Sequence, residues 1–133
     1  MISPELSLRD ATLNYLSQKL DKVCKVYRSL PAYDENIPYP FVNFGTLHSV
    51  NSVTQDHVLD TIHITYHVWA DSDDDTRFYQ ILDTLHDTGS ETYDADGYTF
   101  AGIISQLDQQ VIPDNSTGTM LLHGIVTLVF RFI

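Results

Sequence analysis

The stretch from His57 to Leu85 constrains the fold more than any other part of this sequence. Residues 61–69 read TIHITYHVW, so apolar and polar side chains alternate. A period of two with β-branched and aromatic residues predicts a strand that buries one face. After the acidic segment 71–75, apolar residues at positions 78, 81, 82 and 85 recur at helical spacing. The chain therefore passes from a long strand into an amphipathic helix through an acidic corner.

The rest of the chain predicts elements that pair with this strand or pack under this helix. Ser3 and Pro4 suit the start of a first helix, and Gly89 suits the position just after the second. The predicted helices span residues 5–20 and about 73–87, the other strands 23–27, 41–50, 99–112 and 119–133, and the turns 51–56, 91–98 and 113–118. The order α-β-β-β-α-β-β forms one domain, residues 1–133. Hairpin connections predict an α+β fold, a mainly antiparallel β-sheet with two helices packed on one face.

Charge and cysteine content exclude several classes of function. The formal net charge is −11, and it is uneven: five basic and three acidic residues give +2 over residues 1–28, whereas two basic and fifteen acidic residues give −13 over the other 105. Such an acidic surface argues against binding to nucleic-acid phosphates, which requires clustered Lys and Arg. The single cysteine, Cys24, excludes an intrachain disulfide and a cysteine-based zinc site. Without a signal-peptide pattern or an apolar run near the ~20 residues of a membrane span, we expect a soluble protein with no membrane partner.

Two clusters resemble metal sites, and neither has a complete ligand set. The acidic corner begins like a calcium loop, but Thr76 stands where such a loop needs glycine and Leu82 where it needs a bidentate glutamate. Helix capping and the helix dipole explain these acids more simply. His57, His63 and His67 share one side of the predicted strand, where the nearer two lie about 13 Å apart, too far for one zinc ion. We therefore predict a polar strand face turned to solvent or a partner, with no metal and no cofactor.

The sequence also lacks the motifs of the common catalytic sites. It contains no nucleophile elbow, no glycine-rich phosphate loop and no His-Glu-x-x-His pair. Cys24 is predicted to be a small buried hydrophobe, although the neighbouring lysines could lower its pKa. We therefore predict no catalytic residues and no enzyme.

Several motifs, weak singly, are informative in their order. A first helix with leucines at positions 6, 13, 16 and 20 leads to a short strand. The segment Pro-Tyr-Pro-Phe-Val at 38–42 enters a strand that ends at Gly45, and Tyr-His-Val-Trp-Ala at 66–70 ends the long strand before the acidic corner. Over nearly its whole length the sequence resembles the tail terminator and tail-to-head joining (tail completion) proteins of long-tailed bacteriophages.

The resemblance implies a structural protein of the virion tail or neck, assembled in the host cytoplasm as a ring, usually of six copies. Such a ring caps the tube of major tail protein and docks on the head completion complex, or connector. Genomic DNA passes through without specific binding, and the family offers no catalytic residues to carry over. The strong acidity of this chain departs from the family pattern and leaves open which face is the lumen. An acidic lumen or cap would keep passing DNA from sticking, and the residues expected there are Asp71, Asp73, Asp74 and Asp75.

We expect the contacts of this assembly in the loops at 50–57 and 113–118 and in the linker 31–38. Rings use heterologous contacts, in which one patch meets a different patch on the neighbour, and loops often become ordered on docking. The loop residues assigned to these contacts are Val50, Asn51, Ser52, Val53, Thr54, Gln55, Asp56, Asp114, Asn115, Ser116 and Thr117.

Three alternatives remain at this point. The first is a head-completion or neck protein, which the sequence hardly separates from a tail terminator. The second is a small ligand-binding α+β domain, with a pocket between the helix 78–85 and the sheet, lined by Tyr66, Trp69 and Phe100. The third is an enzyme that uses the histidine face, which requires a metal or a histidine held by a carboxylate.

Overall fold

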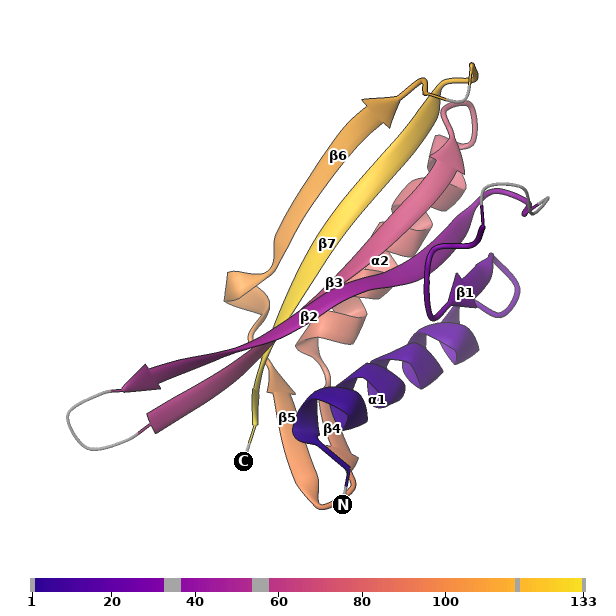
Figure 1. Ribbon diagram of the computed structural model, residues 1–133. Helices are drawn as coiled ribbons and strands as arrows, with labels where there is room; N and C mark the ends of the chain where they lie inside the picture. The colour runs from indigo at the N-terminus through magenta and orange to yellow at the C-terminus, as the bar shows by residue number, and fades with distance from the viewer. Residues whose placement is uncertain (1, 33–36, 54–57, 117, 133) are drawn as a thin grey trace.

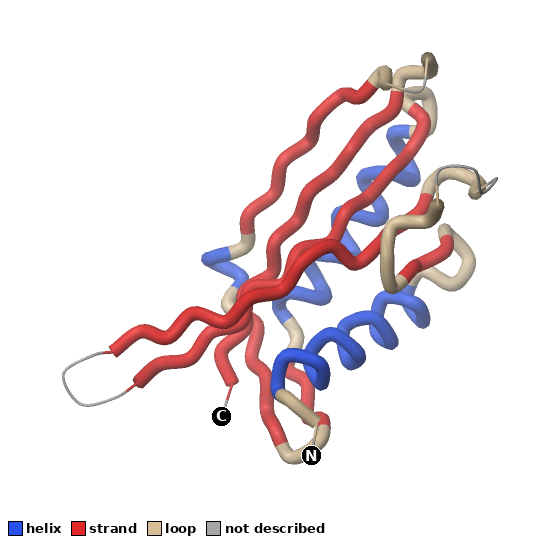
Figure 2. Tube along the Cα trace, viewed as in Figure 1, coloured by secondary structure: helices blue, strands red, loops and turns tan. Residues whose placement is uncertain are grey.

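The computed structural model describes residues 2–32, 37–53, 58–116 and 118–132, and it shows one twisted sheet with two helices on one of its faces (Figures 1 and 2). In chain order the elements are α1 (Pro4–Lys19), β1 (Lys25–Tyr27), β2 (Phe41–Val53), β3 (Val58–Asp71), α2 (Asp75–Ser90), β4 (Thr92–Ala95), β5 (Tyr98–Gly102), the 3₁₀ helix η1 (Ile104–Gln106), β6 (Asp108–Asp114) and β7 (Leu121–Phe132). The predicted α+β class, the mainly antiparallel sheet and the order α-β-β-β-α-β-β are confirmed. No helix among the described residues is long and apolar enough to cross a membrane.

Strand β3 lies in the middle of the sheet. It pairs with β2 on one side and, from Thr61 to Asp71, with β7 on the other, both antiparallel. The far edge of β7 is shared end to end: β6 pairs with residues 121–127 and β5 with residues 130–132. The order across the sheet is β1-β2-β3-β7-β5-β4, with β6 as a second neighbour of β7. The parallel pair is β1 with β2.

The alternating pattern of β3 places the core as predicted. Its apolar positions from 62 to 70, together with the apolar positions 126, 128 and 130 of β7 that pair with them, are buried on the face that carries both helices. The buried side chains of this core are Ile62, Ile64, Tyr66, Val68 and Ala70 of β3, Val126, Leu128 and Phe130 of β7, Phe78, Ile81, Leu82 and Leu85 of α2, and Leu8, Leu13 and Leu16 of α1, with Leu20 just after it. A period-two pattern and a period-3.6 pattern thus bury matching stripes against each other.

Helix α1 is held by its cap and by one buried polar contact. The Ser3 hydroxyl accepts a hydrogen bond from the Leu6 amide at 3.2 Å, and Pro4 is the first helical residue. On the inner side, the Thr12 hydroxyl lies 2.7 Å from the Tyr66 hydroxyl of β3. Both groups are buried, and this contact gives the Tyr66 hydroxyl a partner inside the core. The Thr12 hydroxyl also donates to the Leu8 carbonyl oxygen of its own helix at 2.9 Å.

The predicted acidic turn 91–98 is instead a hairpin. Residues 92–95 form β4, which pairs with β5. Asp96 and Gly97 both have positive φ, 54° and 85°, as the two central residues of a type I′ hairpin turn require. An Asp-Gly pair is a strong signal for such a turn, and the acidic composition of the segment obscured it.

The predicted strand 99–112 is interrupted, and α2 is longer than predicted. The strand is interrupted at residues 103–107, where η1 separates β5 from β6. Helix α2 continues through Gly89 and ends at Ser90. A Cβ atom on Gly102 would lie only 2.0 Å from the Gly89 carbonyl oxygen. The glycines therefore permit β5 to pass directly against the end of α2, so Gly89 serves close packing, and the prediction that it follows the helix was wrong.

The β2–β3 hairpin extends beyond the rest of the sheet as an arm (Figure 1). Residues 58–60 of β3 pair with residues 51–53 of β2, whereas the partners in β7 begin only at Thr61. The register between β2 and β3 shifts after Phe44, and the shift includes Gly45, over which the His67 ring lies. A bulge at this point increases the local twist of β2 within the body of the sheet.

We expect Gly102→Ala to destabilise the protein by about 2 kcal/mol or more, because its methyl group meets backbone that no side-chain rotation can move aside. Gly97→Ala is the control: its Cβ would enter open space, so its cost is the positive φ alone, about 1 kcal/mol. Urea unfolding measures both. Equal midpoints for the two variants would contradict the close packing of β5 on α2.

Candidate functional site

The face of the sheet opposite the helices carries a polar and aromatic stripe. On β3 it consists of Thr61, His63, Thr65, His67 and Trp69, which are all partly exposed. These are the positions for which the sequence predicts a polar strand side. We call this surface the open face, because neither helix packs on it.

The structure pairs His67 with a histidine from the neighbouring strand. His67 Nδ1 lies 2.8 Å from His123 Nε2, and the His123 ring stacks on the Trp69 indole with 3.8 Å between ring centroids. The Trp69 Nε1–H donates a hydrogen bond to Asn43 Oδ1 at 3.0 Å. Since one imidazole nitrogen donates and the other accepts, the pair requires at least one neutral ring.

A second histidine pair lies further along the open face. The rings of His48 and His63 stack with 4.8 Å between their centroids. Between the two pairs, the hydroxyls of Thr65 and Thr127 lie 2.9 Å apart. The sequence did not predict that His48 and His123 belong to the open face, because strand register alone decides which residues of β2 and β7 lie beside β3.

The environment favours the neutral form of His63, His67 and His123. Burial lowers the pKa of His67, and burial followed by the neighbouring His48 lowers the pKa of His63. For His123, burial and His67 lower the pKa, against an opposing effect of Asp114. Each of the four imidazoles described on the open face contacts another imidazole. These residues therefore do not form the histidine–carboxylate pair of a general base.

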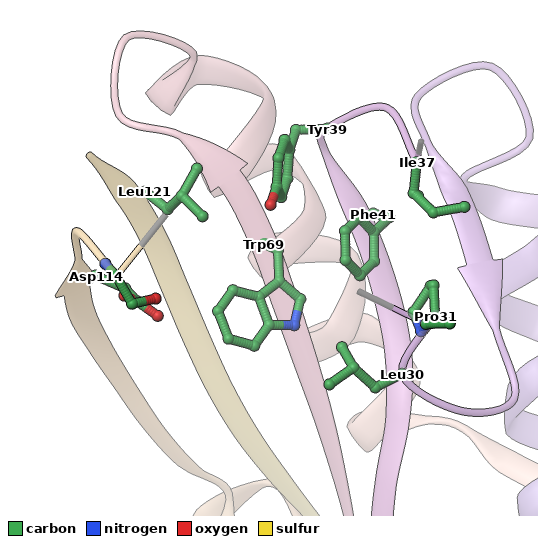
Figure 3. A pocket seen from close by; sticks show the side chains of 10 residues that line it. Leu30, Pro31, Ile37, Tyr39, Phe41, Trp69, Asp114 and Leu121 are labelled. Atoms are coloured by element: carbon green, nitrogen blue, oxygen red, sulfur yellow. The ribbon is translucent and has the colours of Figure 1, made fainter. Parts of the chain in front are cut away.

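One end of the open face is hollowed into an apolar depression of about 490 Å³. The side chains of Trp69, Phe41 and Tyr39 turn towards it, with Asp114 on its rim (Figure 3). Its other lining residues are Leu30, Pro31, Ala32, Ile37, Ser116 and Leu121. The hollow thus brings together two of the predicted contact regions, the linker 31–38 and the turn 113–118.

Asp114 stays ionised at the edge of this hollow. Its Oδ1 accepts a hydrogen bond from the Ser116 amide at 2.8 Å, and the hydrogen bonds from Ser116 lower the pKa of the carboxyl group. Asn115 and Ser116 are exposed, and Thr117 lies outside the described residues.

The acidic corner lies at the same end of the molecule. The Ser72 amide donates to the Met120 carbonyl at 3.1 Å, which joins the corner to the start of β7. Asp74 occupies the N-cap position of α2, but its carboxylate binds Arg77 Nε at 2.6 Å in place of a helix amide. Asp73 and Asp75 are exposed, and Asp71 is partly exposed. Among the described residues, no group of three potential metal ligands converges here or elsewhere.

The third predicted contact region lies at the opposite end, on the arm (Figure 1). Val50 and Asn51 are exposed near the end of β2, and Ser52 and Val53 complete that strand. Thr54, Gln55 and Asp56, with His57, lie outside the described residues. The structure therefore separates the assembly contacts predicted from sequence into two groups at the two ends of the sheet.

The structure does not support the ligand pocket lined by Tyr66, Trp69 and Phe100 or a lowered pKa for Cys24. Tyr66 and Phe100 are fully buried in the core, whereas Trp69 lies on the open face, so these residues do not line one ligand pocket. Cys24 precedes β1, and burial raises the pKa of its thiol to about 12. The thiol is therefore protonated at neutral pH, in keeping with a half-buried apolar role.

Two solved structures share this fold at low sequence identity. A chain of the structure named "Virion of native gene transfer agent (GTA) particle" matches with a TM-score of 0.66 and 10% identity, over 95% of this chain and 94% of that one. A second solved chain, whose name describes no function, matches with a TM-score of 0.54 and 10% identity, over 96% of this chain and 92% of that one. No protein-family model and no curated protein matches the sequence. At this identity the likeness establishes the fold.

We expect the protein to lose stability as the pH falls below about 6.5. The unfolded chain protonates its histidines near that pH, whereas the folded state holds the pKa of His67 and His123 lower, so the unfolded state binds more protons in this window. The free energy of unfolding then decreases as the pH falls, and a loss of about 1 kcal/mol lowers the melting temperature by roughly 4 °C.

The His123→Gln variant should therefore show a weaker decrease in melting temperature between pH 7.5 and pH 5 than the wild type. His86→Gln, which changes a histidine of α2 outside the open face, is the control and should keep the wild-type slope. If the melting temperatures of the wild type and the His123→Gln variant decrease equally with pH, a lowered pKa of His123 in the folded state is contradicted.

Proposed function

We propose that this protein is a structural component of a phage-like virion, which forms a ring, of six copies, at the end of the tail tube and joins the tail to the head completion complex. The observation that carries the proposal is the fold shared with a chain of a gene transfer agent virion over 95% of this chain and 94% of that one. The order of motifs that resembles the tail terminator and tail completion proteins supports the same assignment.

The shape of the subunit supports a joining role. The long β2–β3 arm projects at one end, while the linker, the acidic corner and the β6–β7 turn gather at the other (Figure 1). A component between a tail tube and a head connector needs two separate contact regions. The two ends of the sheet offer such a pair on a rigid support.

The chemistry of the open face also supports a role without catalysis. Its imidazoles are partnered with one another, and those of His63, His67 and His123 favour the neutral state. The Cys24 thiol is protonated at neutral pH. The nearby hollow is mainly apolar, as a surface for protein contact would be.

The acidic corner is the part of the chain proposed to face DNA. Asp71, Asp73, Asp74 and Asp75 lie within five residues, and Arg77 pairs with only one of them, Asp74. In a ring these carboxylates would form a repeated band of negative charge, which repels the phosphates of passing DNA.

A head-completion or neck protein is the second candidate, because a fold match to a virion chain supports both positions equally. The two differ in which partner binds first: a terminator binds finished tail tubes, whereas a neck component binds the connector of filled heads. The experiment below therefore includes both partners.

Mass measurement tests the proposal directly. Native mass spectrometry or sedimentation is applied to the purified protein alone, mixed with tubes of the major tail protein, and mixed with heads that carry their connector. We expect concentration-dependent rings, or rings that form on the tubes. A protein that stays monomeric at all concentrations and binds neither tubes nor connectors would refute the proposed function.

Reversal of charge in the acidic corner tests the DNA-facing assignment. We expect the Asp73→Lys/Asp75→Lys variant to slow DNA ejection or to reduce tail-to-head joining at least several-fold, because the new cations attract phosphate. These two acids are chosen because Asp74 is paired with Arg77. Infectious titre and ejection rate are measured in complemented particles.

The Asp83→Lys/Asp87→Lys variant is the matched control, since it reverses two exposed acids on the outer side of α2. Wild-type ejection and joining in the corner variant, or equal defects in both variants, would count against an acidic lumen at the corner.

A further inference from the structure

Strand β6 is an uncovered edge of the sheet. It lies at the outer side of β7 (Figure 1), and six of its seven residues are exposed. The exposed fractions of its two large apolar side chains, Val111 and Ile112, are 37% and 42%. Proteins usually protect an edge with charges, a short strand or a covering element. Here the four central residues, 109–112, are uncharged, and charges occur only at the two ends, Asp108 and Asp114.

The backbone of β6 is also suited to accept another strand. In an antiparallel ladder, alternate residues bond to opposite neighbours. Pro113 has no N–H to donate to β7, which suits an outward-bonding position. Gln109 and Val111 share its parity, so their amide and carbonyl groups point to the free side. A strand of the right charge could therefore add to this edge.

The end charges argue against pairing of β6 with β6 of a second copy. Two such strands in antiparallel register about Val111 would place Asp108 of each copy opposite Asp114 of the other. Like charges directly opposite one another destabilise a cross-strand pair. The edge strand β4 is equally unsuitable, because Asp94 lies within it and Glu91 and Asp96 flank it.

Strand β1 has the complementary charge. It is the edge strand at the other side of the same sheet, with Lys25 inside it and Lys22 and Arg28 beside it. Three of the seven basic residues of this acidic chain thus lie in or beside one edge strand.

The topology places β1 and β6 at the two ends of the same cross-strand rows. Lys25 pairs with Phe41, then follow Trp69 and His123, and the row ends at Ile112 of β6. The next row runs from Val26 to Val111 in the same way. Strand directions along these rows make β1 and β6 antiparallel. A second copy placed edge to edge therefore continues the sheet with an antiparallel pair.

We propose that the β6 edge of one copy pairs with the β1 edge of the next, and that this heterologous contact builds the ring. With continuous rows, Lys25 of the added copy stands opposite Ile112 and diagonal to Asp114, within reach of an ion pair. A contact between two different edges repeats from copy to copy and closes into a ring when the rotation between copies permits. This inference rests on the proposed ring function and names the surface that forms it.

Disulfide trapping tests the pairing. Both double variants are made in a Cys24→Ala background. Lys25→Cys/Ile112→Cys tests the register in which the cross-strand rows are continuous. Lys25→Cys/Gln110→Cys tests a register shifted by two residues. Mild oxidation, with and without tail tubes, should give a ladder of covalent oligomers from one of these variants, because each copy carries both halves of the contact. The Lys25→Cys and Ile112→Cys single variants should give almost no covalent oligomers, because each copy then carries only one half of the contact. Lys25→Cys/Gln80→Cys, with an exposed partner on α2, is the control that should give no ladder.

Charge reversal provides a second measurement. Asp114→Lys should raise the concentration needed for half-assembly by roughly tenfold. The Lys25→Asp/Asp114→Lys variant should recover most of the lost assembly, because the two charges of the ion pair are exchanged and still attract each other. Thermal unfolding of each variant shows that the fold is retained.

The outcomes separate the two proposals. Rings of unchanged mass without a ladder from either double variant, or efficient trapping of Ile112→Cys alone, would overturn the β6–β1 contact and leave the proposed function standing. Absence of assembly under all conditions, with neither tubes nor connectors bound, would overturn both.

Discussion

The fold depends on one strand that has two different faces. The apolar positions of β3 are buried under α1 and α2, and its polar positions form the open face. A slip of one residue in its register would exchange the two faces and expose the core side chains, so burial holds β2 and β7 in place on either side. The hydrogen bond between the hydroxyls of Tyr66 and Thr12 joins the same strand to α1.

This register also determines the chemistry of the open face. Histidines that are far apart in the sequence stand side by side, and partial burial favours the neutral forms of His63, His67 and His123. The neutral imidazoles of these three residues make a polar surface with a low charge on the twisted sheet, next to an apolar hollow. Such a surface suits contact with protein better than chemistry on a small substrate.

The distribution of charge over the molecule is consistent with assembly by shape. Acids gather at the corner between β3 and α2 and along the edges β4 and β6, while bases gather around β1. The ends of the sheet carry loops, and its sides carry free edges of opposite charge. In the proposed assembly, contacts with other virion components and contacts between copies would therefore use different parts of one sheet.

The α+β class, the two-faced strand, the amphipathic helix after it and the burial of their apolar stripes could all be predicted from the sequence. Periodicity is a local property, which consecutive residues carry. The break between β5 and β6 and the continuation of α2 through Gly89 were not predicted, since close packing of glycines is not a local property. The Asp96–Gly97 turn has a local signal, but its acidic segment was interpreted as a simple turn. Three features required the folded chain: the contact of His123 with His67, the hollow shared by the linker and the β6–β7 turn, and the position of β1 and β6 at the ends of the same cross-strand rows. Each of these depends on strand order and register, which set distances between residues that lie far apart in the chain.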